Sequence, residues 1–169
     1  MNFRFDFLRR ALRAAAVVLP GLYMQNGALA LAQPAHGAIT TVADFDATTW
    51  TKLLRSGPRP AAYVFTNSFC ATCPQAFDAL QKSVLASGKP VPTAAILMDV
   101  QGERALAHAH HYAGVTTVYA FDGFEPAIRQ AVDPTWRNIT PYVVLVARNG
   151  TLQRVTGQPN AAQLKAWLG

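Results

Sequence analysis

Short apolar runs alternate along this chain with segments in which apolar residues recur every three or four positions. Residues 61–66 and 93–99 are apolar without polar alternation and are rich in strand formers, a pattern typical of strands buried on both faces of a sheet. Residues 142–147 form another such run, and residues 115–121 have the length of a short strand. These patterns predict a sheet whose central strands are covered on both sides.

Helical periodicity marks the segments between these runs. Trp50, Leu53 and Leu54 recur at the spacing of one helical face. Phe77, Leu80 and Val84 follow the i, i+3, i+7 spacing of a helix with one apolar stripe. Three further helices are predicted, over residues 103–112, 125–132 and 161–168.

The end of the chain carries a hairpin signal. Asn149-Gly150, which favours a tight turn, joins the apolar run 142–147 to residues 152–156. Strands that alternate with helices and then end in a hairpin and a helix predict an α/β fold. We expect a central mixed sheet that is flanked by helices.

The first 32 residues have the pattern of a secretory signal peptide. Four arginines precede an apolar stretch over residues 14–24, and small residues around Ala30 and Ala32 offer cleavage sites, of which the one after Ala32 is preferred. A membrane-spanning helix needs about 20 apolar residues, so a cleaved signal is favoured over an uncleaved anchor. We therefore expect a periplasmic or otherwise exported protein, with a linker over residues 33–41 and one domain over residues 42–169.

Composition and charge fit one domain and argue against nucleic-acid binding. Of 169 residues, 51% are apolar and 14% are charged, which is enough to bury a single core. The net charge is +6, but four arginines and Asp6 place +3 of it in the first thirteen residues, and the later basic residues are scattered. A nucleic-acid surface needs them clustered. Glycine-rich nucleotide motifs are also missing from the sequence, and no cofactor is expected.

The two cysteines of the chain, Cys70 and Cys73, lie where the strand 61–66 passes into the next helix. Free N–H groups and the macrodipole of a helix N-terminus favour the thiolate. We expect Cys70, in the first helical turn, to attack, and Cys73, further in and less exposed, to resolve the mixed disulfide. An inert Cys70–Cys73 disulfide is the alternative, but so short a loop restricts the unfolded chain little. The pair is predicted to exchange electrons with thiols or disulfides of client proteins and of a redox partner.

With this motif in place, the chain resembles the thioredoxin superfamily over residues 42–168. One matching motif covers residues 63–74 and ends in Cys70-Ala-Thr-Cys73-Pro74, and the second begins at Thr140-Pro141. The resemblance implies that the Thr140–Pro141 bond is cis, faces the cysteines and helps to dock an extended substrate segment. Phe69 stands where the family usually has tryptophan, and we expect it to keep the packing role beside the substrate.

The interval between the two motifs is longer than in minimal thioredoxins, because residues 103–121 add a helix and a strand before the Pro141 strand. This insertion resembles the TlpA-like, cytochrome-c-maturation branch of exported thiol-disulfide oxidoreductases. Besides Phe69, two further features depart from the family. The buried acid of minimal thioredoxins falls near Val64, and Ala71-Thr72 matches neither the common reductant nor the common oxidant dipeptides. The direction of electron flow is left open.

A copper-binding chaperone of thioredoxin-like fold is the alternative function. Proteins of the Sco type also combine two cysteines with a later histidine, and here His108 or His111, which can share a helical face, would join Cys70 and Cys73. The cysteines of that type are one residue further apart. The histidines are more simply explained as part of a solvent-exposed helix, so no metal is expected at the favoured site.

Overall fold

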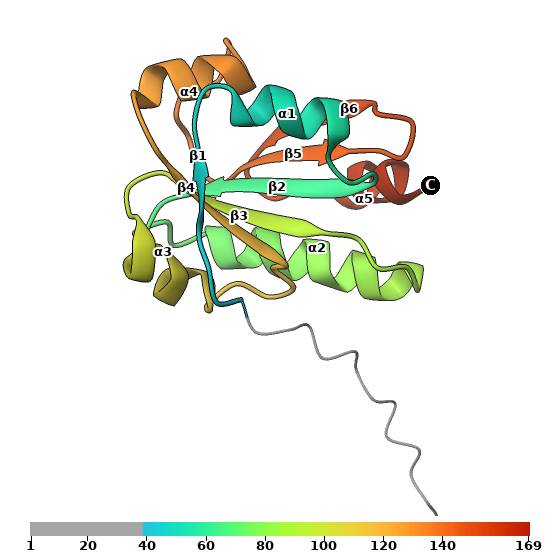
Figure 1. Ribbon diagram of the computed structural model, residues 1–169. Coiled ribbons are helices and arrows are strands. Elements are labelled where there is room, and N and C mark those ends of the chain that lie inside the picture. Colours follow the sequence, from blue (N-terminus) through green and yellow to red (C-terminus); the bar gives the residue numbers. More distant parts are fainter. Residues whose placement is uncertain (1–38) are drawn as a thin grey trace, which may run out of the picture. The chain divides into compact units, whose positions relative to one another are not determined.

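The computed structural model describes residues 39–169 (Figure 1). The predicted signal peptide and residues 33–38 of the predicted linker lie outside the described residues, so these expectations stay predictions. Within the described range, no helix has the length and apolar character needed to cross a membrane. The elements follow the order β1 (Ala43–Phe45), α1 (Thr49–Ser56), β2 (Ala61–Thr66), α2 (Cys73–Ser87), β3 (Thr93–Leu97), α3 (Gly102–Ala109), β4 (Thr117–Phe121), α4 (Glu125–Val132), β5 (Tyr142–Val146), β6 (Leu152–Thr156) and α5 (Ala161–Leu168).

The strands form one mixed sheet in the order β1-β4-β3-β2-β5-β6. β2 lies inside the sheet, parallel to β3 and antiparallel to β5, and β5 pairs with β6 as an antiparallel hairpin. All residues of β2, β3 and β5 are buried, as their continuous apolar runs predict. The predicted α/β fold, with a central mixed sheet, is confirmed.

Helices cover both faces of this sheet and give it two apolar cores. One core packs α2 and α5 against the sheet and includes Phe77, Leu80 and Trp167. The other packs α1 and α4 against the opposite face and includes Trp50 and Ile128. Figure 1 shows α1 and α4 on one side of the strands and α2 on the other. Successive side chains of a strand point to opposite faces, so each buried strand supplies both cores.

The Asn149-Gly150 turn forms as predicted. Gly150 has a φ of 87°, a left-handed conformation that glycine adopts without steric cost. Its N–H donates to the Ala147 carbonyl oxygen at 2.8 Å. The last helix is fixed to the same end of the sheet by Trp167, whose indole N–H lies 3.0 Å from the Ala61 carbonyl oxygen and 3.1 Å from that of Val146.

The predicted insertion is present as α3 and β4, and β4 separates β3 from the edge strand β1. The strand β1 was not predicted, because three residues carry too little periodicity to be recognised. The helix predicted over residues 103–112 ends at Ala109. The chain turns there, with the Tyr112 N–H donating to the Ala109 carbonyl oxygen at 3.0 Å, and this turn carries the Tyr112 side chain into the core.

Candidate functional site

The two cysteines lie in the connection from β2 to α2. This connection consists of two successive turns, in which the Cys70 N–H donates to the Asn67 carbonyl oxygen at 3.2 Å and the Cys73 N–H donates to the Cys70 carbonyl oxygen at 3.3 Å. α2 therefore begins at Cys73, with Thr72 as its N-cap residue. The prediction that Cys70 occupies the first helical turn is wrong by three residues, because residues 67–72 are used for these turns. Cys70 still lies at the N-terminal, positive end of a 15-residue helix.

Cys70 and Cys73 form a disulfide with a Cα–Cα distance of 5.4 Å, which is within the usual range for such a bond. Cys73 is fully buried in the core under α2, while Cys70 is only partly buried and packs against the edge of that core. The two sulfurs therefore differ in their access to a partner molecule. The Cys70 sulfur is the one that an incoming thiol or disulfide can reach.

The second sequence motif lies beside the cysteine turn. The Thr140–Pro141 peptide bond is cis, as the resemblance implied. The Asn67 side-chain amide donates to the Thr140 hydroxyl oxygen at 3.2 Å, across 73 residues of sequence. Pro141 is also held from the hairpin side, because the Gly157 N–H donates to its carbonyl oxygen at 2.7 Å. The fold thus joins Asn67, at the start of the cysteine turn, to the residue before the cis-proline.

A carboxylate from the neighbouring strand holds the start of the cysteine turn. Asp99 follows β3, and its carboxylate accepts hydrogen bonds from the Ser68 N–H at 2.9 Å and the Ser68 hydroxyl at 2.6 Å. The carboxyl ends of parallel strands meet at one edge of a sheet, so a polar residue just after β3 lies beside the residues that follow β2. That rule would have identified Asp99 from the sequence. Asn67 carries no comparable signal, because its partner Thr140 is distant in the chain.

Beneath the turn, the site is closed by an aromatic pair and a short polar contact. Tyr112 stacks on Phe77 of α2 with ring centroids 4.1 Å apart, and its hydroxyl lies 3.0 Å from the Thr66 hydroxyl at the end of β2. Val64 is fully buried. In residues 39–169 the buried polar residues are Thr66 and Thr93, and neither carries an acid. The position where minimal thioredoxins place a buried carboxylate is therefore apolar here.

Two large apolar side chains are exposed next to the site. Phe69, directly before Cys70, is 78% exposed, and Ile139, directly before Thr140, is 53% exposed. Exposed apolar side chains at a concave or reactive site are typical of contact surfaces for another molecule. The exposure of Phe69 leaves its ring accessible at the surface beside Cys70, and its expected role beside a substrate stays a prediction.

The histidines of the copper alternative lie on α3 and in the turn that follows it. The rings of His108 and His111 have centroids 5.9 Å apart, and His108 also meets Tyr112 edge to face at 5.5 Å. Within residues 39–169, no three His, Cys, Asp or Glu side chains are grouped so that they could hold a metal ion. The structure thus brings the two histidines to each other and not into a ligand set with the cysteines.

Comparison with known proteins agrees with this geometry at the level of the fold. No model of a known protein family matches the chain, and no curated protein sequence is significantly similar to it. Among solved structures, a thioredoxin-related protein from Neisseria meningitidis serogroup B is similar with a TM-score of 0.51 and 19% identity, over 68% of this chain and 87% of that one. A thio-disulfide isomerase from Thermus thermophilus is similar with a TM-score of 0.50 and 23% identity, over 68% and 80% of the two chains. The chain therefore has a thioredoxin-like fold.

Proposed function

We propose that this thioredoxin-like chain is an exported thiol-disulfide oxidoreductase that exchanges electrons with protein thiols and disulfides through Cys70 and Cys73. One observation carries the proposal. The partly exposed Cys70 and the buried Cys73 form a disulfide at the start of α2, and Asn67 connects their turn to the cis Thr140–Pro141 bond. A structural disulfide would require neither the difference in exposure nor the adjoining cis-proline segment.

The reaction is two successive exchanges of a disulfide bond. In the reduced protein, the Cys70 thiolate attacks one sulfur of a client disulfide, which forms a mixed disulfide and releases the other client sulfur as a thiolate that takes up a proton. Cys73 then attacks the Cys70 sulfur, which forms the Cys70–Cys73 disulfide and releases the second client thiol. Two electrons pass to the client, and the same steps in reverse oxidise a client dithiol.

The substrate segment docks beside the attacking sulfur. Thr140 and Pro141 are held at this place from two sides, by the Asn67 amide on Thr140 and by the Gly157 N–H on the Pro141 carbonyl oxygen. Phe69 and Ile139 add exposed apolar surface on the two sides of the site. The client is accordingly a protein segment with apolar side chains near its cysteine.

The presence of α3 and β4 between the two motifs supports assignment of the chain to the TlpA-like branch.

Export is supported by the N-terminal pattern of arginines, an apolar stretch and small residues before position 33. Outside the cytosol, disulfide chemistry is a common task of small proteins with one cysteine pair. The redox partner that resets Cys70 and Cys73 after each cycle would then be another exported or membrane-bound protein.

Trapping of the mixed disulfide tests the proposal. Reduced Cys73→Ser protein is mixed with a peptide that contains one disulfide, and adducts are identified by mass spectrometry. Without Cys73 the intermediate through Cys70 cannot be resolved internally, so a stable one-to-one adduct at Cys70 is expected. The matched Cys70→Ser variant keeps only the thiol of Cys73. Because that thiol is buried, this variant should form little adduct. Adducts on Cys73, or none with either variant, would overturn the proposal.

A further inference from the structure

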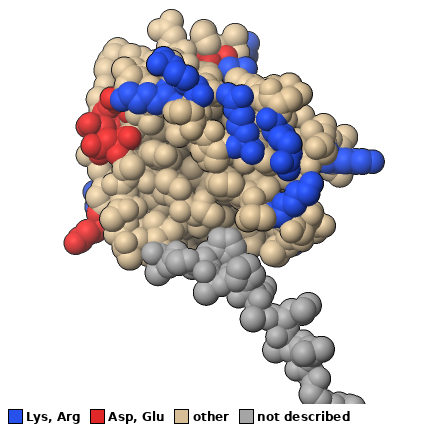
Figure 2. Space-filling view, turned by 45° about the vertical axis from the view of Figure 1, so that its right-hand side comes forward, with Lys and Arg blue, Asp and Glu red and all other residues tan. Residues whose placement is uncertain are grey.

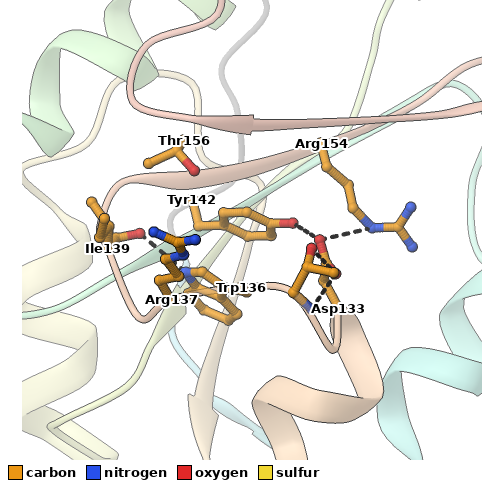
Figure 3. Close-up of a pocket in the computed structure, with 8 residues that line it drawn as sticks. Asp133, Trp136, Arg137, Ile139, Tyr142, Arg154 and Thr156 are labelled. Carbon is orange, nitrogen blue, oxygen red and sulfur yellow. Dashed lines mark hydrogen bonds and ion pairs between the residues drawn. The ribbon is translucent and has the colours of Figure 1, made fainter.

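A pocket of about 340 Å³ opens beside the cis-proline segment. Its lining comes from the connection between α4 and β5, from the first residue of β5 and from β6, and Figure 3 shows these side chains around the Tyr142 ring. The side chains around the pocket include Asp133, Trp136, Arg137, Ile139, Tyr142 and Arg154. The reaction proposed above does not use this pocket.

The floor of the pocket is rigid. Trp136 and Tyr142 stack with ring centroids 4.4 Å apart and planes 15° from parallel, and both are buried. The Trp136 indole N–H donates to the Ile139 carbonyl oxygen at 3.1 Å. A stacked pair that is also hydrogen-bonded to the chain does not need to rearrange when a ligand arrives, which lowers the cost of binding.

One carboxylate lies in the pocket and its acceptors are already occupied. Asp133 accepts hydrogen bonds from the Tyr142 hydroxyl and, at 2.8 Å and 2.7 Å, from the N–H and hydroxyl of Thr135. Arg154 forms an ion pair with it at 3.6 Å. Burial alone would raise the pKa of Asp133, but these hydrogen bonds and Arg154 outweigh burial and lower it. Asp133 is therefore ionised at neutral pH and neutralised by its own neighbours.

The pocket carries one more positive charge than its carboxylate neutralises. Arg137 is exposed at the rim and makes no ion pair within the described part of the chain. Figure 3 shows Tyr142 between Arg137 on one side and Asp133 with Arg154 on the other. Two guanidinium groups against one carboxylate give the pocket a formal charge of +1. Guanidinium groups bind carboxylates with paired, charge-assisted hydrogen bonds.

The pocket adjoins the place where a client would dock. Ile139 is directly before Thr140, and Thr156, which also lines the pocket, pairs with Tyr142 across the hairpin. Tyr142 and Trp136 belong to the core under α1 and α4, whereas Cys73 belongs to the core under α2. The pocket therefore opens on the sheet face opposite α2, and residues 139–141 separate it from the cysteines.

We infer that this pocket is a specificity subsite that takes an acidic side chain of the client, at a residue a few positions along the chain from the reacting cysteine. The inference rests on the proposed function, because the client segment must cross residues 139–141 to place its carboxylate beside Arg137. The face drawn in Figure 2 carries more Lys and Arg than Asp and Glu, but this general positive charge does not select one client residue over another, so the selection falls to the side chains of the pocket itself.

Matched peptides test the inference. Each peptide is blocked at both ends, contains one cysteine as a mixed disulfide with 2-mercaptoethanol, and carries Glu, Gln or Lys at one position, scanned from one to five residues on either side of the cysteine. The reduced protein reduces this disulfide and becomes oxidised, releasing the peptide thiol and 2-mercaptoethanol. At one position, we expect the second-order rate constant to be about fivefold higher for Glu than for Gln, as one partly exposed ion pair allows, and lowest for Lys.

Arg137→Gln should abolish the preference for Glu, and Arg137→Glu should reverse it in favour of Lys. The control is Arg148→Gln, which makes the same charge change at the exposed far end of the β5–β6 hairpin and should keep the preference. High salt should weaken the preference in the unaltered protein, because it screens exposed charges. Circular dichroism confirms that each variant is folded.

The outcomes are distinguishable from failure of the proposed function. If no peptide is reduced, the oxidoreductase proposal fails. If all peptides are reduced at equal rates, or the Glu preference survives Arg137→Gln, the subsite inference is overturned while the function stands. A Gln peptide with a free C-terminal carboxylate tests whether the pocket binds the end of a chain instead of a side chain. If it alone gains in rate, the pocket binds chain termini, and the inferred side-chain subsite is wrong.

Discussion

At the scale of single residues, the contact between Asn67 and Thr140 joins the two halves of the site. The Asn67 amide donates to the Thr140 hydroxyl oxygen, while the Asn67 Oδ1 atom is buried without a hydrogen-bond partner within residues 39–169. A buried polar group without a partner destabilises the folded state, and removing both members of a pair costs less than removing one. Asn67 is thus a positioning residue whose contribution depends on Thr140.

This asymmetry gives a prediction for a double-mutant cycle. Thr140→Val keeps the side-chain volume but leaves the Asn67 amide group without its acceptor, so the free energy of unfolding should fall by about 1–2 kcal/mol. Adding Asn67→Ala should recover part of this loss, because the unpaired groups are then removed together. Urea titrations of the two single variants and the double variant measure the cycle. Simple additivity of the two losses would show that the hydrogen bond does not couple these residues.

At the scale of elements, β2 carries the site at its carboxyl end and is held in place by aromatic packing under α1. Tyr63 of β2 is buried and meets Trp50 of α1 edge to face, with ring centroids 5.3 Å apart. Burial is the main cause that raises the pKa of Tyr63 to about 12; the nearby Tyr119 also raises this pKa, and Arg59 lowers it. The phenol must therefore stay protonated in the folded state at a pH where it ionises in the unfolded chain.

The raised pKa of Tyr63 makes stability depend on pH above 10. The unfolded state loses the Tyr63 proton near pH 10 and the folded state only near pH 12, so this residue's contribution is complete below pH 10 and is lost as the pH rises towards 12. Between pH 10 and 11 the loss should be about 1 kcal/mol from this group. Urea titrations of the oxidised protein at pH 10 and pH 11 should show a smaller fall in the free energy of unfolding for Tyr63→Phe than for the unaltered protein. An equal decline in the variant would contradict the assigned cause.

The order of the elements could be read from the sequence, and several of their junctions could not. Apolar runs identify β2, β3 and β5, since burial on both faces leaves a direct imprint on composition. The start of α2 was placed three residues too early, because Asp99 and the turns at Asn67 and Cys70 decide it. These are contacts between segments that lie far apart in the chain or within loops, and periodicity does not record them.

At the scale of the whole molecule, the fold assembles a reactive centre from distant segments. The cysteine pair and the cis-proline could be identified because each belongs to a compact sequence motif. The pocket lined by Trp136, Arg137 and Arg154 could not, since its residues come from a connection and from a separate strand, and no spacing rule links them. The fold therefore brings together side chains that lie far apart in the sequence, and no single motif identifies them as one site.

In the proposed function, the molecule offers one reactive sulfur to its partners and keeps the other as a resolving group, as the full burial of Cys73 and the partial exposure of Cys70 indicate. Alkylation of the reduced protein measures this difference between the two thiols. Iodoacetamide is added at pH 7, samples are quenched with acid over time, and peptide mass spectrometry follows each cysteine. We expect Cys70 to be modified at least about tenfold faster than Cys73, as an accessible thiolate at a helix N-terminus should be. The rate of exchange with a disulfide peptide should fall in proportion to the fraction of Cys70 that is alkylated. Equal or faster modification of Cys73 would contradict these expectations.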